Sequence, residues 1–275
     1  MAGPIGIFDS GYGGLTVLED IQKRLPQYDY LYLGDNARAP YGTRSFEVIY
    51  EYTLQAVQEL FDRGCHLVIL ACNTASAKAL RTIQQNDLQR IAPGKKVLGV
   101  IRPSTELIGN YSKTKNIGVL ATEGTVSSQS YLIEIHKFFP DCRVYQHACP
   151  IWVPLIENNE HQTDEGRAFI KQDIQKLLQQ SSEIDTILLG CTHYPLILNE
   201  IEAIVPDHIK VIAQGEIIAN SLADYLERHV EIEGKCSKNG TIRFLTSENT
   251  EIFDHNATLY TSFDVASDYV DLSKR

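Results

Sequence analysis

Two short stretches decide the fold of this 275-residue chain: His66-Leu-Val-Ile-Leu-Ala-Cys-Asn-Thr-Ala-Ser76 and Asp185-Thr-Ile-Leu-Leu-Gly-Cys-Thr-His-Tyr-Pro195. Each begins with a branched apolar run typical of a buried strand, followed by one small residue, a cysteine and hydrogen-bonding side chains. The pattern predicts a thiol, Cys72 or Cys191, at the carboxyl end of a strand, where open α/β sheets bind ligands. We expect the two thiols to face one pocket from opposite sides. The alternative is two ordinary strand ends with coincidental cysteines.

Strand-like runs alternate with helical periodicity along nearly the whole chain, which predicts α/β units with mostly parallel sheets. The matched cysteine stretches favour two doubly wound domains related by pseudo-two-fold symmetry, with the active site in the cleft between them. We place Cys72 in a domain of residues 1–97 plus 209–275, and Cys191 in residues 98–208. Predicted strands lie near residues 5–8, 28–33, 67–71, 97–100, 117–121, 143–148, 186–189, 209–212 and 241–245. Three apolar helix stripes are predicted: Leu15, Leu18, Ile21 or Gln22 and Leu25; Val48, Tyr52, Val57 and Leu60; and Phe169, Ile174 and Leu177 or Leu178. Gly64 is placed to end the second of these helices.

Composition excludes several classes of protein. The net charge of −10 and pI of about 5.3 argue against nucleic acid or an anionic membrane as the main partner. The first residues do not form a signal peptide, and the apolar runs fall short of the roughly 18 residues that span a bilayer, so a cytoplasmic protein is expected. Its six cysteines would then be reduced. No metal site is expected, because the Cys191-x-His193 pair lacks two further ligands at suitable spacing.

The loop Asp9-Ser-Gly-Tyr-Gly-Gly-Leu15 follows the first predicted strand and opens the first helix. Its glycines allow backbone N–H groups to face an anion, but neither the dinucleotide nor the P-loop pattern is present, and Asp9 repels phosphate. A carboxylate ligand held by Ser10 fits better, and a capped tight turn is the alternative. A second loop, residues 35–43, offers Tyr41 as an aromatic wall and Gly42 as a free amide, or is an ordinary turn.

The reactive form of cysteine is the thiolate, which a following helix amino terminus stabilises. Both Cys72 and Cys191 precede helical stretches, and His193 could exchange a proton with Cys191. Glu157 ends an apolar run, so it lies either at the edge of a water-poor cleft, which would raise its pKa, or in solvent. The other thiols, Cys65, Cys142, Cys149 and Cys236, are interpreted as structural.

Taken together, five segments in order resemble glutamate racemase, the cofactor-independent enzyme that makes D-glutamate for bacterial peptidoglycan. The matching segments are Phe8–Leu15, Ala39–Gly42, Ala71–Ser76, Cys149–Glu157 and Gly190–Leu196, spread over about two thirds of the chain. The resemblance implies two α/β domains, no cofactor, and a two-base reaction in which Cys72 deprotonates D-glutamate and Cys191 deprotonates L-glutamate. It also implies that Asp9 assists Cys72 and that His193 assists Cys191, with Glu157 in the same proton network. The substrate-binding residues that it implies are Asp9, Ser10, Pro40, Tyr41, Gly42, Asn73, Thr74, Thr122, Thr125, Thr192 and His193.

Three positions depart from the family pattern: Tyr12, Arg102 and Gln214-Gly215. They bear on regulation and assembly, and leave open both a homodimer and activation by a cell-wall precursor. Rival functions also remain at this point. One is a related racemase that acts on aspartate or a hydantoin, because a pocket sized for one more methylene group discriminates between substrates by only about 1–3 kcal/mol. A two-domain binding protein would leave the thiols without a role, and a cysteine hydrolase has no use for the second thiol.

Overall fold

The computed structural model describes residues 1–274, which form two compact units. The first contains residues 1–100 and the chain from residue 215 onward, and the second contains residues 101–214. Each unit has one sheet in which every strand pair is parallel. The predicted α/β class and its parallel sheets are confirmed.

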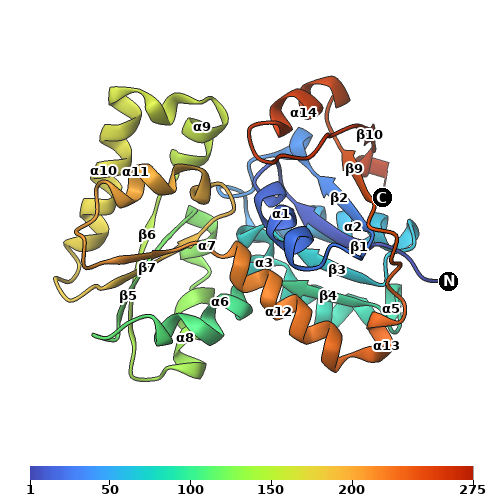
Figure 1. The fold of residues 1–275 in the computed structure, drawn as a ribbon, viewed down its shortest axis with the longest axis horizontal. Helices are drawn as coiled ribbons and strands as arrows, with labels where there is room; N and C mark the ends of the chain where they lie inside the picture. Colours follow the sequence, from blue (N-terminus) through green and yellow to red (C-terminus); the bar gives the residue numbers. More distant parts are fainter. Residues whose placement is uncertain (275) are drawn as a thin grey trace. The chain divides into compact units, whose positions relative to one another are not determined.

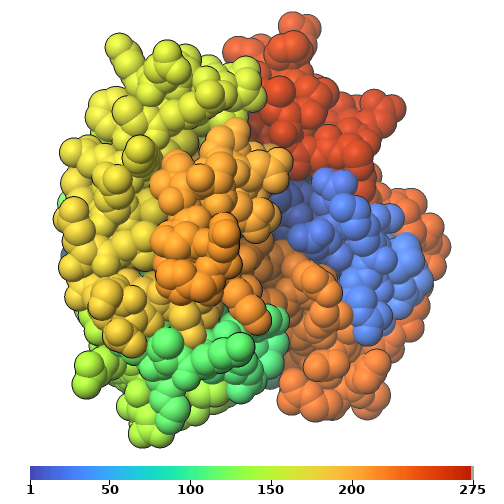
Figure 2. Space-filling model, turned by 60° about the vertical axis from the view of Figure 1, so that its left-hand side comes forward, coloured from blue at the N-terminus to red at the C-terminus, as the bar shows by residue number. Residues whose placement is uncertain are grey.

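The first unit is built on a six-stranded sheet in the order β10-β9-β2-β1-β3-β4. Its strands are β1 (Ile5–Asp9), β2 (Tyr30–Gly34), β3 (Leu67–Leu70), β4 (Lys96–Gly99), β9 (Ile242–Thr246) and β10 (Ser267–Tyr269). Its helices are α1 (Gly14–Arg24), α2 (Phe46–Asp62), α3 (Asn73–Lys78), α4 (Leu80–Thr82), α5 (Leu88–Ile91), α12 (Gly215–Arg228), α13 (Val230–Glu233) and α14 (Thr250–Ala257). Figures 1 and 2 show α1, in blue, beside α12, in orange, at the surface of this unit.

The alternation of strand side chains explains how helices cover this sheet. Phe8 and Leu33 belong to a fully buried cluster that also contains Leu60 of α2. Because successive strand residues point to opposite faces, Tyr32 lies on the other face, and its hydroxyl donates to the carbonyl of Gly11 just before α1. Both faces are therefore covered, and the strands read as continuous apolar runs.

The second unit has a four-stranded sheet in the order β6-β5-β7-β8. Its strands are β5 (Asn116–Ala121), β6 (Arg143–Ala148), β7 (Thr186–Gly190) and β8 (Lys210–Ile212), and its helices are α6 (Ile101–Leu107), α7 (Glu123–Ser127), α8 (Ser130–Phe138), α9 (Trp152–Glu157), α10 (Asp164–Leu178) and α11 (Leu198–Glu202). Gly118 of β5 leaves room for Leu177 of α10, and Gly190 of β7 leaves room for Tyr131 of α8. Figure 1 shows α8 and α10 on opposite sides of this sheet.

The nine predicted strands are present, but the prediction missed β10, whose sequence Ser-Asp-Tyr has no apolar pattern. Gly64 adopts a φ of 96° directly after α2, as predicted for a glycine that ends a helix. The third helix stripe is wrong at Phe169, which is 43% exposed, because α10 turns Ile170 inward with Ile174 and Leu177 instead. Among residues 1–274, every helix is too short or too polar to cross a membrane.

Candidate active site

Cys72 lies at the junction of β3 and α3 in the first unit, and it is the N-cap residue of α3. The backbone N–H of Ala75 donates to its sulfur at 3.4 Å, and the hydroxyl oxygen of Ser10 lies 3.4 Å from the same sulfur. The cysteine is 5% exposed. Two polar hydrogens can thus be directed at the sulfur, at a helix amino terminus, which is an environment that favours negative charge.

Asp9 ends the neighbouring strand β1 and is completely buried. Its carboxylate accepts a hydrogen bond from the N–H of Gly11 at 3.0 Å. Because Phe8 pairs with Leu70 across the two strands, the register carries Asp9 and Ser10 alongside the end of β3, next to Cys72. Gly14 keeps this corner open, since a Cβ there would lie 2.5 Å from the Cβ of Asp9.

The residues that follow Cys72 also belong to this corner. Asn73 and Thr74 form the first turn of α3, and both are buried. Their backbone N–H groups are among those that an α-helix leaves without an intrahelical acceptor. The predicted contributors from β1 and β3 are therefore gathered at one edge of the first sheet.

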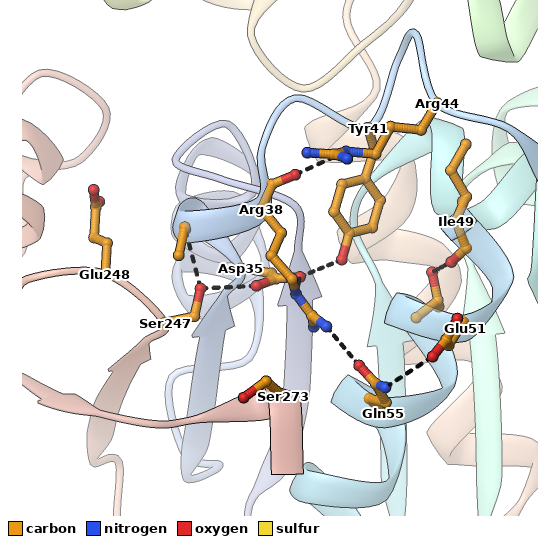
Figure 3. A network of polar contacts seen from close by, with 12 residues as sticks. Asp35, Arg38, Tyr41, Arg44, Ile49, Glu51, Gln55, Ser247, Glu248 and Ser273 are labelled. Atoms are coloured by element: carbon orange, nitrogen blue, oxygen red, sulfur yellow. Dashed lines mark hydrogen bonds and ion pairs between the residues drawn. The ribbon is translucent and has the colours of Figure 1, made fainter. Parts of the chain in front are cut away.

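The loop after β2 carries Pro40, Tyr41 and Gly42, and a buried carboxylate holds it in place. Asp35 accepts hydrogen bonds from the hydroxyls of Tyr41 and Ser247 and from Nε of Arg38, the last two at 2.7 Å (Figure 3). Pro40 is exposed, whereas Tyr41 is buried against Phe8. Burial beside Asp35 raises the pKa of Tyr41 well above its ordinary value, so the phenol stays a donor.

Arg38 extends the same network toward α2. Its guanidinium donates to the side-chain oxygen of Gln55 (Figure 3). The guanidinium also lies over the ring of Tyr52, 4.0 Å from the ring centre. The carbonyl of Arg38 accepts from Nε of Arg44 at 3.0 Å. Arg38 thus ties one end of the loop segment that contains Tyr41 to α2, and Arg44 joins the other end of the segment back to Arg38.

In the second unit, Cys191 follows β7, and it is succeeded by a short 3₁₀ turn, η5 (Tyr194–Ile197). Nδ1 of His193 lies 4.0 Å from the sulfur, and Nε2 of His193 lies 2.9 Å from Oε1 of Glu157. Burial opposes the charged imidazole, but hydrogen bonds with Cys191 and Glu157 outweigh it and raise the pKa of His193 to about 10. The raised pKa favours the protonated imidazole at neutral pH, and the ring lies between the sulfur of Cys191 and the carboxyl group of Glu157.

Thr122 is the counterpart of Ser10 in the second unit. The pairing of Ala121 with Gly190 puts Thr122, directly after β5, beside Cys191. Its hydroxyl caps α7 by accepting from the N–H of Thr125, and it donates to the hydroxyl of Thr125. Thr192 is also buried. The structure therefore gathers the predicted residues of this unit at the carboxyl edge of β5 and β7.

The remaining four thiols lie outside these two groups and are buried. Burial raises the pKa of Cys65 to about 12 and that of Cys236 to about 11, and it also raises the pKa values of Cys142 and Cys149. These groups are protonated at neutral pH, which makes them poor bases and nucleophiles.

Sequence reasoning missed the residues that hold the site residues in place, namely Asp35, Arg38, Gln55, Ser247, Trp152, Asp173 and Tyr194. Asp35 alone carried a usable signal, because it comes one glycine after a predicted strand, and Asp9 also follows a predicted strand. Its partner Ser247 is 212 positions away in the chain, so no local pattern could have joined them.

The chain matches the model of the Asp/Glu/Hydantoin racemase family over residues 13–222. It is 41% identical over 266 residues to a glutamate racemase of Ruegeria sp. (strain TM1040), an alignment that covers 93% of this chain and 96% of the relative. The chain therefore belongs to the Asp/Glu/Hydantoin racemase family.

Solved structures agree with this assignment. The glutamate racemase from Francisella tularensis subsp. tularensis SCHU S4, in complex with D-glutamate, superposes with a TM-score of 0.86 at 31% identity, covering 99% of this chain and 98% of that one. The Escherichia coli glutamate racemase, in complex with L-glutamate and the activator UDP-MurNAc-ala, gives a TM-score of 0.75 at 27% identity, with 97% and 98% covered.

Proposed function

We propose that this protein interconverts L-glutamate and D-glutamate by a two-thiol proton transfer at Cα that uses no cofactor. The observation that carries the proposal is that each unit places one cysteine at the carboxyl edge of its sheet beside its own polar partners, Ser10 and Asp9 for Cys72 and His193 and Glu157 for Cys191. The similarity to glutamate racemases over nearly the whole chain supports glutamate as the substrate.

In the direction from D to L, the thiolate of Cys72 takes the α-proton, and the C–H electron pair remains on the substrate as a carbanion. The thiol of Cys191 then donates its proton to the opposite face of Cα. Cys72 ends as a thiol and Cys191 as a thiolate, so the atoms and charges balance. Before the next turnover in the same direction, the Cys72 thiol must lose its proton and the Cys191 thiolate must regain one. The reverse reaction starts directly from this state.

The polar partners suit these two roles. A charged His193 can give a proton to a Cys191 thiolate, and Glu157, whose side chain is 30% exposed, can connect His193 with solvent protons. Asp9 is completely buried beside the end of β3, so we assign it the assisting role for Cys72.

The substrate's charged groups need donors around the reacting carbon. We assign the carboxylates to N–H and hydroxyl groups at the starts of α3 and α7, because helix amino termini stabilise anions and because carbanion formation transfers charge onto the α-carboxylate. The residues assigned to substrate binding are Asp9, Ser10, Pro40, Tyr41, Gly42, Asn73, Thr74, Thr122, Thr125, Thr192 and His193.

The proposed cellular role is the supply of D-glutamate for peptidoglycan in the cytoplasm. The Escherichia coli relative is crystallised with the activator UDP-MurNAc-ala, which supports a search for activation of this protein by a cell-wall precursor. Assembly into a homodimer also stays a proposal, and size-exclusion chromatography with light scattering tests it.

The test is racemisation of purified protein in D₂O without added cofactor, followed by circular dichroism and by NMR of the α-proton. We expect the product to carry deuterium at Cα, and we expect Cys72→Ala and Cys191→Ala each to abolish measurable racemisation, while Cys142→Ala retains it. Near-normal racemisation by either active-site variant would refute the two-base assignment.

The same assay separates the rival functions. Equal turnover of aspartate would identify a racemase of a different substrate, and turnover of a hydantoin would do the same. Tight binding of one amino acid without turnover would indicate a binding protein. Release of ammonia or another hydrolysis product would indicate a cysteine hydrolase.

A further inference from the structure

A buried group of side chains lies behind the Glu157–His193 pair and has no part in the proton transfer described above. Trp152 is the first residue of α9, and Glu157 is the last. The indole is completely buried, and its Nε1–H donates to Oδ2 of Asp173 at 3.0 Å. The helix that carries Glu157 is therefore joined to α10, which carries Asp173, by a buried hydrogen bond.

The carboxylate of Asp173 has further donors. Its Oδ1 lies 3.0 Å from Nε2 of His147, at the end of β6, and 3.3 Å from Nζ of Lys176. His147, Cys149 and Asp173 also bring atoms that can ligate metals within 4.8 Å of one another. However, nitrogen donors already occupy both oxygens of Asp173, and burial holds the pKa of Cys149 well above its ordinary value. A hydrogen-bonded support therefore accounts for these residues better than a metal site.

The same indole also contacts the segment that carries His193. The ring of Trp152 packs on that of Tyr194, with 4.8 Å between centres and an angle of 56° between planes. Tyr194 directly follows His193, and its hydroxyl donates to the carbonyl of Cys149 at 3.2 Å. Trp152 thus supports both partners, Glu157 through α9 and His193 through its neighbour Tyr194.

We propose that Asp173 is a positioning residue for racemisation, which acts through Trp152 to hold Glu157 in hydrogen-bonding contact with His193. The inference rests on the proposed function. Without Asp173, the buried indole N–H loses its acceptor and α9 can shift, which moves Glu157 relative to His193 and Cys191. A misplacement of about 1 Å in a catalytic constellation can lower the rate by roughly 100-fold.

The test uses Asp173→Leu, which keeps the side-chain size but removes the acceptor, and Trp152→Phe, which keeps an aromatic ring but removes the donor. We expect both variants to lower kcat by about 10- to 100-fold with a smaller change in KM, because the change acts on the contact between Glu157 and His193 and leaves the other assigned substrate-binding residues in place. Trp152→Phe keeps the test decisive if Asp173→Leu does not fold, and circular dichroism checks the folding of both.

Kinetic constants alone cannot assign this loss to one face of the substrate. L- and D-glutamate have equal free energies, so kcat/KM must fall equally in both directions. Deuterium exchange can make the distinction. When D-glutamate is the substrate in D₂O, Cys72 first holds the proton that it took from the substrate. Slow proton delivery by Cys191 prolongs the carbanion, so the Cys72 thiol has time to exchange this proton for a solvent deuteron and to return the deuteron to the same face of Cα. With D-glutamate as the substrate, we expect the ratio of deuterated D-glutamate to L-glutamate formed to rise severalfold in the variants. With L-glutamate as the substrate, we expect no matching rise in the amount of L-glutamate that gains deuterium without inversion.

The matched control is Asp185→Asn in the same unit. Asp185 precedes β7, at the amino edge of the sheet, and accepts from Ser112 and from the N–H groups of Lys113 and Thr114. Its loss should lower stability while leaving the exchange ratio unchanged. If Asp185→Asn changes the ratio as Asp173→Leu does, general destabilisation explains the effect and the positioning role is wrong.

A double-mutant cycle with Glu157→Gln tests the route of the effect. If Asp173 acts through Glu157, Asp173→Leu should cause little further loss of kcat in the Glu157→Gln background. An undiminished loss in that background, or an exchange ratio equal to that of the wild type, would overturn the inference. Failure of the wild-type protein to racemise glutamate would instead refute the proposed function, so the two failures are distinguishable.

Discussion

Replacing Tyr41 with Phe removes a single oxygen, and the expected cost can be worked out from the surroundings of Asp35. The phenylalanine ring can keep the packing of Tyr41 against Phe8 and Tyr52, whose ring centres lie 6.2 Å and 5.8 Å away. The completely buried carboxylate of Asp35 loses one of its donors but keeps Arg38 and Ser247. Hydrogen bonds to charged groups contribute about 1.5–3 kcal/mol, so we expect Tyr41→Phe to lower the free energy of unfolding of the first unit by about 2 kcal/mol.

Asp35→Leu should cost more than Tyr41→Phe. It leaves the guanidinium of Arg38, a mostly buried cation, without its carboxylate, and removing one partner of a buried ion pair costs about 3–5 kcal/mol. The control is Tyr50→Phe, because the hydroxyl of Tyr50 also donates to an aspartate, Asp87, from α2 of the same unit. Tyr50 is partly exposed, so water can replace the lost bond, and we expect less than about 1 kcal/mol.

Urea unfolding measured by far-UV circular dichroism provides the assay, and the only tryptophan of the chain provides an internal control. Trp152 lies in the second unit, so its fluorescence reports on that unit alone. We expect Tyr41→Phe and Asp35→Leu to shift the dichroism transition of the first unit. An unchanged transition for Tyr41→Phe, or a smaller loss for Asp35→Leu than for Tyr41→Phe, would refute the reasoning.

Three further predictions concern single residues. The pKa of His193 is raised from 6.5 to about 10, so its contribution to stability is complete below pH 6.5 and is lost as the pH rises through about 10. The difference in the free energy of unfolding between the wild type and His193→Gln should therefore shrink over that pH range. Gly14→Ala brings a Cβ to 2.5 Å from that of Asp9, so both melting temperature and racemase activity should fall, whereas Gly234→Ala, where the nearest atom is 3.3 Å away, should leave activity intact. Cys65→Ala should retain wild-type kcat/KM while losing stability, and a fall in kcat/KM at unchanged folding would contradict its structural role.

The sequence was sufficient to predict nine strands and the polar residues at their carboxyl ends because both depend on local signals. A branched apolar run such as Leu67–Leu70 forms a buried strand wherever it pairs, and the polar residues after it must emerge at the carboxyl edge of a parallel sheet. Strand β10 was missed for the complementary reason. Its three residues pair with β9 through backbone groups, so its side chains carry no pattern.

Side-chain networks could not be predicted in the same way, because they depend on the register between distant segments. Asp35 accepts hydrogen bonds from its own loop and from Ser247, and Asp173 accepts a hydrogen bond from Trp152 on a different helix. A carboxylate in a helical pattern indicates solvent exposure by default, but Asp173 is buried where it meets Trp152 of α9 and His147 of β6. The supports of the site thus become visible only once the helices are packed.

The two thiols occupy equivalent positions but have chemically different partners. Strand register puts a hydroxyl residue beside each cysteine, Ser10 beside Cys72 and Thr122 beside Cys191. The titratable residues beside them differ, since Asp9 is completely buried near Cys72, whereas His193, whose pKa is raised to about 10, lies near Cys191. Equal free energies of the enantiomers force kcat/KM to be the same in both directions, but they place no such demand on how each carbanion partitions between inversion and return. The asymmetry of the partners should therefore appear in the exchange ratios of the wild-type protein itself, and identical ratios from D- and L-glutamate would show that the histidine and the aspartate deliver protons equally well.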